Sequence, residues 1–97
     1  MSEIDIEQLE IVAARLKSIA HPIRIAIISL LQEKGKLSVT DIHNILEIGQ
    51  AVASHHLNIL KTNGILSCKR EGKQMHYTLK SNNLNKILEC INKCSTD

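Results

Sequence analysis

The stretch from residue 49 to 66, GQAVASHHLNILKTNGIL, constrains the fold of this chain more than any other segment. Ala53, Leu57 and Leu60 recur at the spacing of one face of an α-helix, while polar residues occupy the opposite face. The Asn-Gly pair at 63–64 then ends the helix, because glycine readily adopts the left-handed conformation that follows a helix. The pattern predicts an amphipathic helix that packs on a hydrophobic core and exposes a polar face.

The segments before this helix also show helical periodicity. Hydrophobic spacing predicts one helix over residues 5–19 and a second over 22–34, separated by a His-Pro pair that interrupts the first and starts the second. Ser38 and Asp41 form a variant of the capping box and begin a short third helix. A tight turn at 47–49 follows. A short helix, a turn containing glycine and a longer helix together predict a helix-turn-helix.

The periodicity changes from helical to alternating after the fourth helix. Residues 65–70 and 75–79 alternate in the manner of β-strands, and the turn at 71–73 joins them into a hairpin, or wing. A last helix is expected from Ser81 onward, with Leu84, Ile87, Leu88 and Ile91 at helical spacing. The predicted order is α-α-α-α-β-β-α. We therefore expect a mainly α winged helix-turn-helix with a small β-hairpin, forming one domain over residues 1–97.

Polar and basic residues gather on the fourth helix and the hairpin. No acidic residue lies between Gly49 and Gly64, and Glu71 is the one acid among the basic residues of the hairpin. A polar helix after a tight turn suits the DNA major groove, and a basic hairpin suits phosphate contacts. An ordinary solvated hairpin is the alternative for its basic residues, but their position around the turn favours phosphate contact. The predicted DNA-contacting residues are Gln50, Ala51, Ser54, His55, Asn58, Lys61, Lys69, Arg70 and Lys73.

Length and composition limit the classes of protein that this chain can belong to. The chain has 97 residues and a net charge of +2, so the distribution of charge is a better argument for nucleic acid than its total. No hydrophobic run reaches transmembrane length, and the acidic start MSEIDIEQLE lacks a signal-peptide pattern. We expect a cytoplasmic protein that does not contact membranes. No set of acid, base and nucleophile converges and no glycine-rich phosphate loop is present, so an enzyme is not expected.

The histidines are expected to have different surroundings. His55 falls on the polar face of the fourth helix, whereas His56 lies at the edge of the hydrophobic face and is expected to pack. His21 is interpreted as a helix-entry residue because it precedes proline. His43 and His76 are expected to be solvated. No pair has a convincing spacing for metal ligands.

Three cysteines, Cys68, Cys90 and Cys94, argue by their odd number against a closed set of disulfides. Cys68 is expected to pack against the helices and to be inert. Cys90 and Cys94 have i, i+4 spacing, so they share a face of the predicted last helix. They are either an apolar interface residue and a terminal thiol, or a thiol sensor, or a soft-metal site that two chains share. A soft metal ion at Cys90 and Cys94 is therefore the one cofactor that the sequence suggests.

Three motifs together resemble a known family. The segments LKSIAHPIRIAIISLL, QAVASHHLNILKTNGIL and KREGKQMHYTL resemble the second-helix region, the recognition helix and the wing of the ArsR/SmtB family of bacterial winged helix-turn-helix repressors. The resemblance implies a homodimer held by its first and last helices. It also implies binding to double-stranded DNA at an operator with an inverted repeat, and repression that an inducer relieves.

The chain also departs from that family at the known metal and redox sites. Ser38 and Thr40 stand where the third-helix site has thiols, and hydroxyls do not replace thiolates as soft ligands. The start of the last helix, at 81–83, lacks the ligands of the other familiar zinc site, and the second helix lacks the cysteine of the redox-sensing members. The inducer is therefore thiol-reactive, a soft metal or unknown. A winged-helix protein-interaction module without specific DNA binding is the alternative function, and the absence of acid on the fourth helix argues against it.

Overall fold

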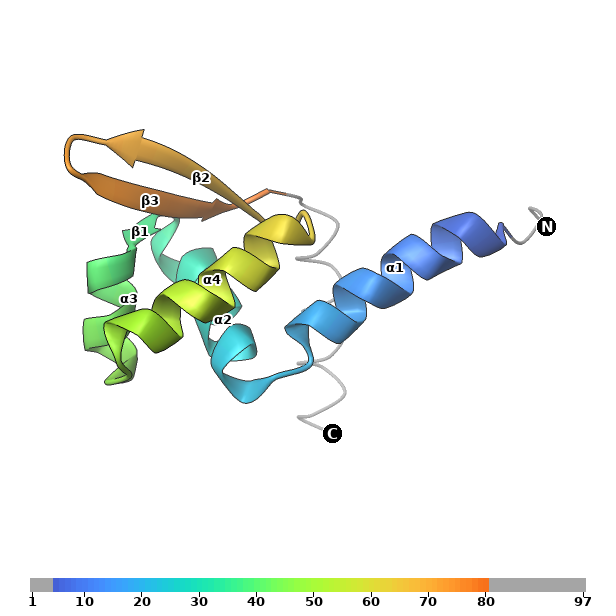
Figure 1. Cartoon of the computed structure of the whole chain (residues 1–97), viewed down its shortest axis with the longest axis horizontal. Coiled ribbons are helices and arrows are strands. Elements are labelled where there is room, and N and C mark those ends of the chain that lie inside the picture. Colours follow the sequence, from blue (N-terminus) through green and yellow to red (C-terminus); the bar gives the residue numbers. More distant parts are fainter. Residues whose placement is uncertain (1–4, 81–97) are drawn as a thin grey trace.

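The structure is a computed structural model that describes residues 5–80. Within these residues α1 extends away from a body that the other elements form, and the β-hairpin lies along one side of that body (Figure 1). The elements, in chain order, are α1 (Ile6–Ile19), α2 (Pro22–Lys34), β1 (Leu37–Ser38), α3 (Val39–Leu46), α4 (Gln50–Thr62), β2 (Leu66–Glu71) and β3 (Gln74–Leu79).

The hydrophobic core lies where α2, α3, α4 and the base of the wing meet. Leu57 of α4 is 0% exposed, as are Ala53 and Leu60 on the same face. Replacing a leucine as deeply buried as Leu57 by alanine costs about 2–5 kcal/mol, because the lost burial is joined by the cavity left behind. The core therefore holds one face of α4 inward and leaves its polar face outside. The other buried members are Ile19, Ile27, Ile28, Leu31, Leu37, Ile42, Ile65 and Leu66.

Local signals set where the helices begin and end. Ser38 Oγ accepts a hydrogen bond from the backbone N–H of Asp41 at 3.0 Å, and Asp41 Oδ2 accepts one from the N–H of Ser38 at 3.1 Å. The capping box is therefore complete, with aspartate in the place where glutamate or glutamine is more common. Gly35 ends α2 with φ of 85°, and Gly64 follows α4 with φ of 76°, the left-handed exit predicted for the Asn-Gly pair.

The sheet has three strands rather than the two of the predicted hairpin. Their order is β1-β3-β2, and all neighbours are antiparallel. The added strand β1 pairs Leu37 with Tyr77 and Ser38 with His76. A strand this short cannot show alternation in the sequence, so the prediction of a simple hairpin missed it. It joins the wing to the start of α3, and the winged helix-turn-helix prediction is otherwise confirmed.

The predicted last helix, with Cys90 and Cys94, lies outside the described residues. The part of the predicted dimer contact that falls on that helix lies outside them as well. No helix between residues 5 and 80 is both long and apolar enough to cross a membrane.

Candidate nucleic-acid interface

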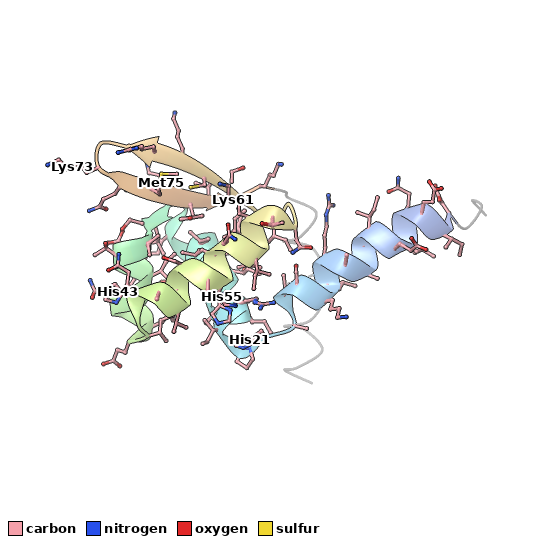
Figure 2. All side chains as sticks on the ribbon, viewed as in Figure 1. His21, His43, His55, Lys61, Lys73 and Met75 are labelled. Atoms are coloured by element: carbon pink, nitrogen blue, oxygen red, sulfur yellow. The ribbon has the colours of Figure 1, made fainter. Side chains whose placement is uncertain are left out.

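The outer face of α4 carries the side chains expected to read DNA. His55 and Lys61 project from α4 in Figure 2, and the buried Ala53, Leu57 and Leu60 occupy its other face. Gly49 caps α4 without a side-chain hydrogen bond, so the first N–H groups of this helix have no side-chain cap. These groups add partial positive charge at the end that follows the tight turn. All six predicted α4 contacts are exposed, namely Gln50, Ala51, Ser54, His55, Asn58 and Lys61.

The turn between α3 and α4 is held by more contacts than the sequence suggested. Glu47 ends α3 in the left-handed region with φ of 54°, and the N–H of Ile48 donates to the carbonyl oxygen of His43 at 3.2 Å. Nδ1 of His43 lies 3.1 Å from the carbonyl oxygen of Ile48. Because a carbonyl oxygen only accepts, Nδ1 carries the proton in this hydrogen bond. His43 is half-buried, so the expectation that it is solvated was wrong.

The wing presents three exposed basic side chains near its tip. Lys69, Arg70 and Lys73 are exposed, and Lys73 lies at the turn (Figure 2). Gly72 adopts φ of 65°, which glycine reaches without strain. Arg70 Nε donates a long hydrogen bond of 3.4 Å to the carbonyl oxygen of Gly72. These contacts place positive charge around the turn, as the sequence predicted.

The single acid of the wing is neutralised by a lysine that the sequence did not single out. Lys36, just before β1, places Nζ 2.9 Å from Oε2 of Glu71 and 3.0 Å from Oε1. Its hydrogen bonds hold the pKa of Glu71 below the ordinary value. The wing therefore carries a larger effective positive charge than its composition indicates. No periodicity or motif links residues so far apart in the chain, and only the folded sheet brings them together.

The inner side of the wing is packed. Cys68 is half-buried and pairs in register with Tyr77, as expected for a residue that packs in the sheet. Burial, together with a hydrogen bond with Cys68, raises the pKa of Tyr77 to about 12. His76 is half-buried and its Nδ1 is buried without a hydrogen-bond partner, so the expectation that it is solvated was wrong.

A cluster of polar side chains lies between α4 and α2. His56 is buried, as predicted, and its Nδ1 lies 3.1 Å from Nε of Arg24. Arg24 Nη1 donates to the carbonyl oxygen of Ser18, at the end of α1, at 3.0 Å. His21 caps α2 by accepting from the N–H of Ile23, and its ring centroid lies 4.5 Å from that of His56. Burial, then the charges of the neighbouring histidines and arginine, lower the pKa of His56.

Metal binding finds no support among residues 5–80. No group of three or more histidine, cysteine, aspartate or glutamate side chains in this range is arranged to hold a metal ion. The cysteine pair for which a soft metal was suggested is outside the range.

Comparison with known proteins agrees with this geometry. The model of a family described as "Bacterial regulatory protein, arsR family" matches residues 21–67, which include α2, the helix-turn-helix and the start of the wing. A cadmium resistance transcriptional regulatory protein, the CadC homolog of Staphylococcus aureus, is 37% identical over 80% of this chain, which spans 64% of the relative's length. The transcriptional repressor PagR of Bacillus anthracis is 31% identical over 93% of this chain and 90% of the relative.

Solved structures agree with the sequence relatives. The crystal structure of PagR has a TM-score of 0.82 with 30% identity, covering 90% of this chain and 99% of that one. A homodimeric winged helix-turn-helix DNA-binding domain of Mycobacterium bovis has a TM-score of 0.85 with 24% identity. The match covers 99% of this chain and 88% of that one, and it shows that the two share a fold. The matching family is one of regulatory proteins and PagR is named a transcriptional repressor, which confirms the prediction of a DNA-binding regulator rather than an enzyme. The chain belongs to the arsR family of bacterial regulatory proteins.

Proposed function

We propose that this protein is a dimeric repressor that binds an operator of two inverted half-sites and leaves it when an inducer binds. The observation that carries the proposal is the division of α4 into a fully buried face and an exposed, acid-free polar face directly after a tight turn. Such a helix lies in the major groove while a basic wing contacts phosphates beside it. PagR is named a transcriptional repressor, which supports the direction of regulation. A cytoplasmic location, where DNA and regulator meet, belongs to the same proposal.

The dimer is proposed from the hydrophobic stripe of α1. Ile6 is 62% exposed, and Leu9, Val12 and Leu16 continue the same stripe at 40–51%. Within the described residues this stripe has no covering element, and α1 extends away from the body (Figure 1). A second copy would bury it by two-fold symmetry. We propose contact through residues 5–19 together with 82–94, and two half-sites about one DNA turn apart.

The DNA contacts are tested by separating phosphate binding from base reading. The Arg70→Ala, Lys73→Ala double variant should weaken binding to every sequence and flatten the dependence of log Kd on log salt by about 0.9 for each phosphate that the variant no longer neutralises. Gln50→Ala or His55→Ala should instead change which sequences are preferred. Lys34→Ala, an exposed lysine at the end of α2, is the control and should leave both quantities unchanged. Gel-shift titration against a selected oligonucleotide pool measures them. Absence of any sequence preference at physiological salt would refute the proposal.

The inducer is proposed to act at Cys94 with Cys90 as partner, through a crosslink between chains or a soft metal ion. Cys68 is half-buried in the wing sheet, and the third-helix positions are hydroxyls, so Cys90 and Cys94 are the remaining thiols of the chain. Only a few kcal/mol of differential stability between the free and DNA-bound forms is needed to release DNA. The Cys90→Ser, Cys94→Ser double variant tests this. If oxidant or soft metal releases the wild type and the variant from DNA equally, the sensor lies elsewhere in the protein. If neither protein responds to these agents, the two cysteines are inert residues.

A further inference from the structure

We infer that Arg24 and His56 are positioning residues that set the orientation of α4 against the end of α1, and that they do so only while the imidazole of His56 is neutral. The inference rests on the proposed function, because its effect on DNA requires that α4 is the helix that reads DNA. It concerns residues that lie on the core side of α4, away from the predicted contacts.

One guanidinium joins three helices. Arg24, on α2, donates from Nε to Nδ1 of His56 on α4 at 3.1 Å. It also donates from Nη1 to the carbonyl oxygen of Ser18 on α1 at 3.0 Å. Ser18 Oγ in turn donates to the carbonyl oxygen of Arg15 at 2.7 Å. Because α1 is the proposed dimer helix, this chain of hydrogen bonds connects the dimer contact to the middle of the recognition helix.

The geometry of these bonds requires a neutral His56. A guanidinium has only donors, so the Nδ1 that receives Arg24 must present a lone pair and cannot carry a proton. A proton added to Nδ1 of His56 would break the bond to Arg24 and place two cations side by side.

Among residues 5–80, the charged groups that act on His56 include no carboxylate that could stabilise such a proton. From α2 the groups that face His56 are Arg24 and, at its N-cap, His21, and from α4 itself His55, whose ring centroid is 5.3 Å away. The guanidinium of Arg15 on α1 lies near Gly64 at the other end of α4, 3.7 Å from the position of an added Cβ. Two other elements, α3 and β2, pack on α4, and they contribute the hydrophobic residues Ile42 and Leu66 to the core. Burial and these positive neighbours lower the pKa of His56, in agreement with the neutral form that the bonds require.

The adjacent histidine has a different role. His55 is exposed on the proposed DNA-contacting face, so a change of its charge acts on phosphate and alters binding to every sequence alike. Protonation of His56 displaces α4, which weakens base reading in particular. The ratio of specific to nonspecific affinity therefore separates the two effects.

The experiment compares variants that keep or remove the acceptor. His56→Asn places an amide oxygen near the position of Nδ1, whereas His56→Leu fills the space without an acceptor, and His55→Asn is the matched control on the outer face. Fluorescence anisotropy with operator and random DNA at fixed salt gives the specificity ratio from pH 8 to 5.5. We expect the wild-type ratio to fall about tenfold on acidification, the equivalent of 1.4 kcal/mol. The specificity ratio of His56→Asn should stay near the value that the wild type has at pH 8 over the whole pH range. The specificity ratio of His56→Leu should be low at every pH. His55→Asn should keep the wild-type fall.

The outcome that overturns the inference is a His56→Leu protein whose ratio and pH profile match the wild type, with far-ultraviolet circular dichroism showing that both are folded. A second measurement needs no DNA. In the free protein, the NMR amide chemical shifts of both α1 and α4 should change in His56→Leu relative to the wild type. The same shifts should change when the wild type is acidified. In His56→Asn they should stay near the wild-type values of pH 8. If these shifts move but no sequence is preferred at any pH, the proposed function fails and the positioning role stands. If they do not move, the positioning role fails whatever the protein binds.

Discussion

Tyr77 is the only aromatic residue of the chain, so its ionisation reports on the packing of the wing without interference. Burial, followed by the hydrogen bond with Cys68, raises its pKa from the ordinary 10.0 to about 12. Because the neutral phenol is favoured by folding, this stability is present below pH 10 and is lost as pH rises toward the folded value. Absorbance at 295 nm should titrate near pH 12 in the native protein and near pH 10 in denaturant. Cys68→Ala should lower the native midpoint, and a midpoint of 10 in the native protein would mean that the side chain is solvated.

The buried imidazole of His56 makes the free energy of unfolding depend on pH. Its pKa is lowered from 6.5 by burial and by positive neighbours, so the unfolded chain binds the proton more readily than the folded one. Stability that is present above pH 6.5 is therefore lost as pH falls below 6.5 toward the folded value. Urea unfolding at pH 7.5 and 5.5 should show a larger loss for the wild type than for His56→Asn. Equal losses in the two proteins would assign the acid sensitivity to other groups.

At the scale of elements, the capping box of α3 controls the helix that supports the tight turn. Ser38→Ala removes the acceptor for the N–H of Asp41 and should cost about 1 kcal/mol of unfolding free energy, within a range of roughly 0.5–2. Thr40→Ala, an exposed position one residue before Asp41, is the control and should cost little. Urea denaturation followed by circular dichroism measures both. The hydrogen bonds from Ser38 lower the pKa of Asp41, so the contribution of the box is lost as pH falls below 3.8.

At the scale of the whole molecule, the stripe of α1 predicts how assembly and DNA binding are linked. Leu9→Glu introduces a charge into the stripe, so burying it between two copies would leave that charge without a partner. Ala14→Glu adds the same charge to an exposed position at a helical angle far from Leu9. Sedimentation velocity at tens of micromolar should give a monomer for Leu9→Glu and a dimer for Ala14→Glu and the wild type. Operator binding should fall only for Leu9→Glu, and a wild-type monomer under these conditions would contradict the proposed assembly.

Much of the fold follows from local chemistry. Helical spacing, the Ser38–Asp41 box and the glycines after α2 and α4 predicted the helices of the described region, because caps and periodicity act over a few residues. The same spacing indicated which side of α4 is exposed. Alternation on either side of Gly72 predicted the two longer strands and the basic tip of the wing.

Only the tertiary structure decided which distant side chains meet. Arg24 and His56 are 32 positions apart, and Lys36 and Glu71 are 35 apart, so no local pattern could pair them. The strand β1 exists because β3 provides its hydrogen-bond partners, not because Leu37 and Ser38 have a recognisable strand pattern. Within residues 5–80, the sequence alone determined the four helices, the two longer strands and the exposed polar face of α4, since these depend on neighbours in the chain. The orientation of that face and the neutralisation of the wing acid depend on packing between elements, and packing is a property of the folded molecule.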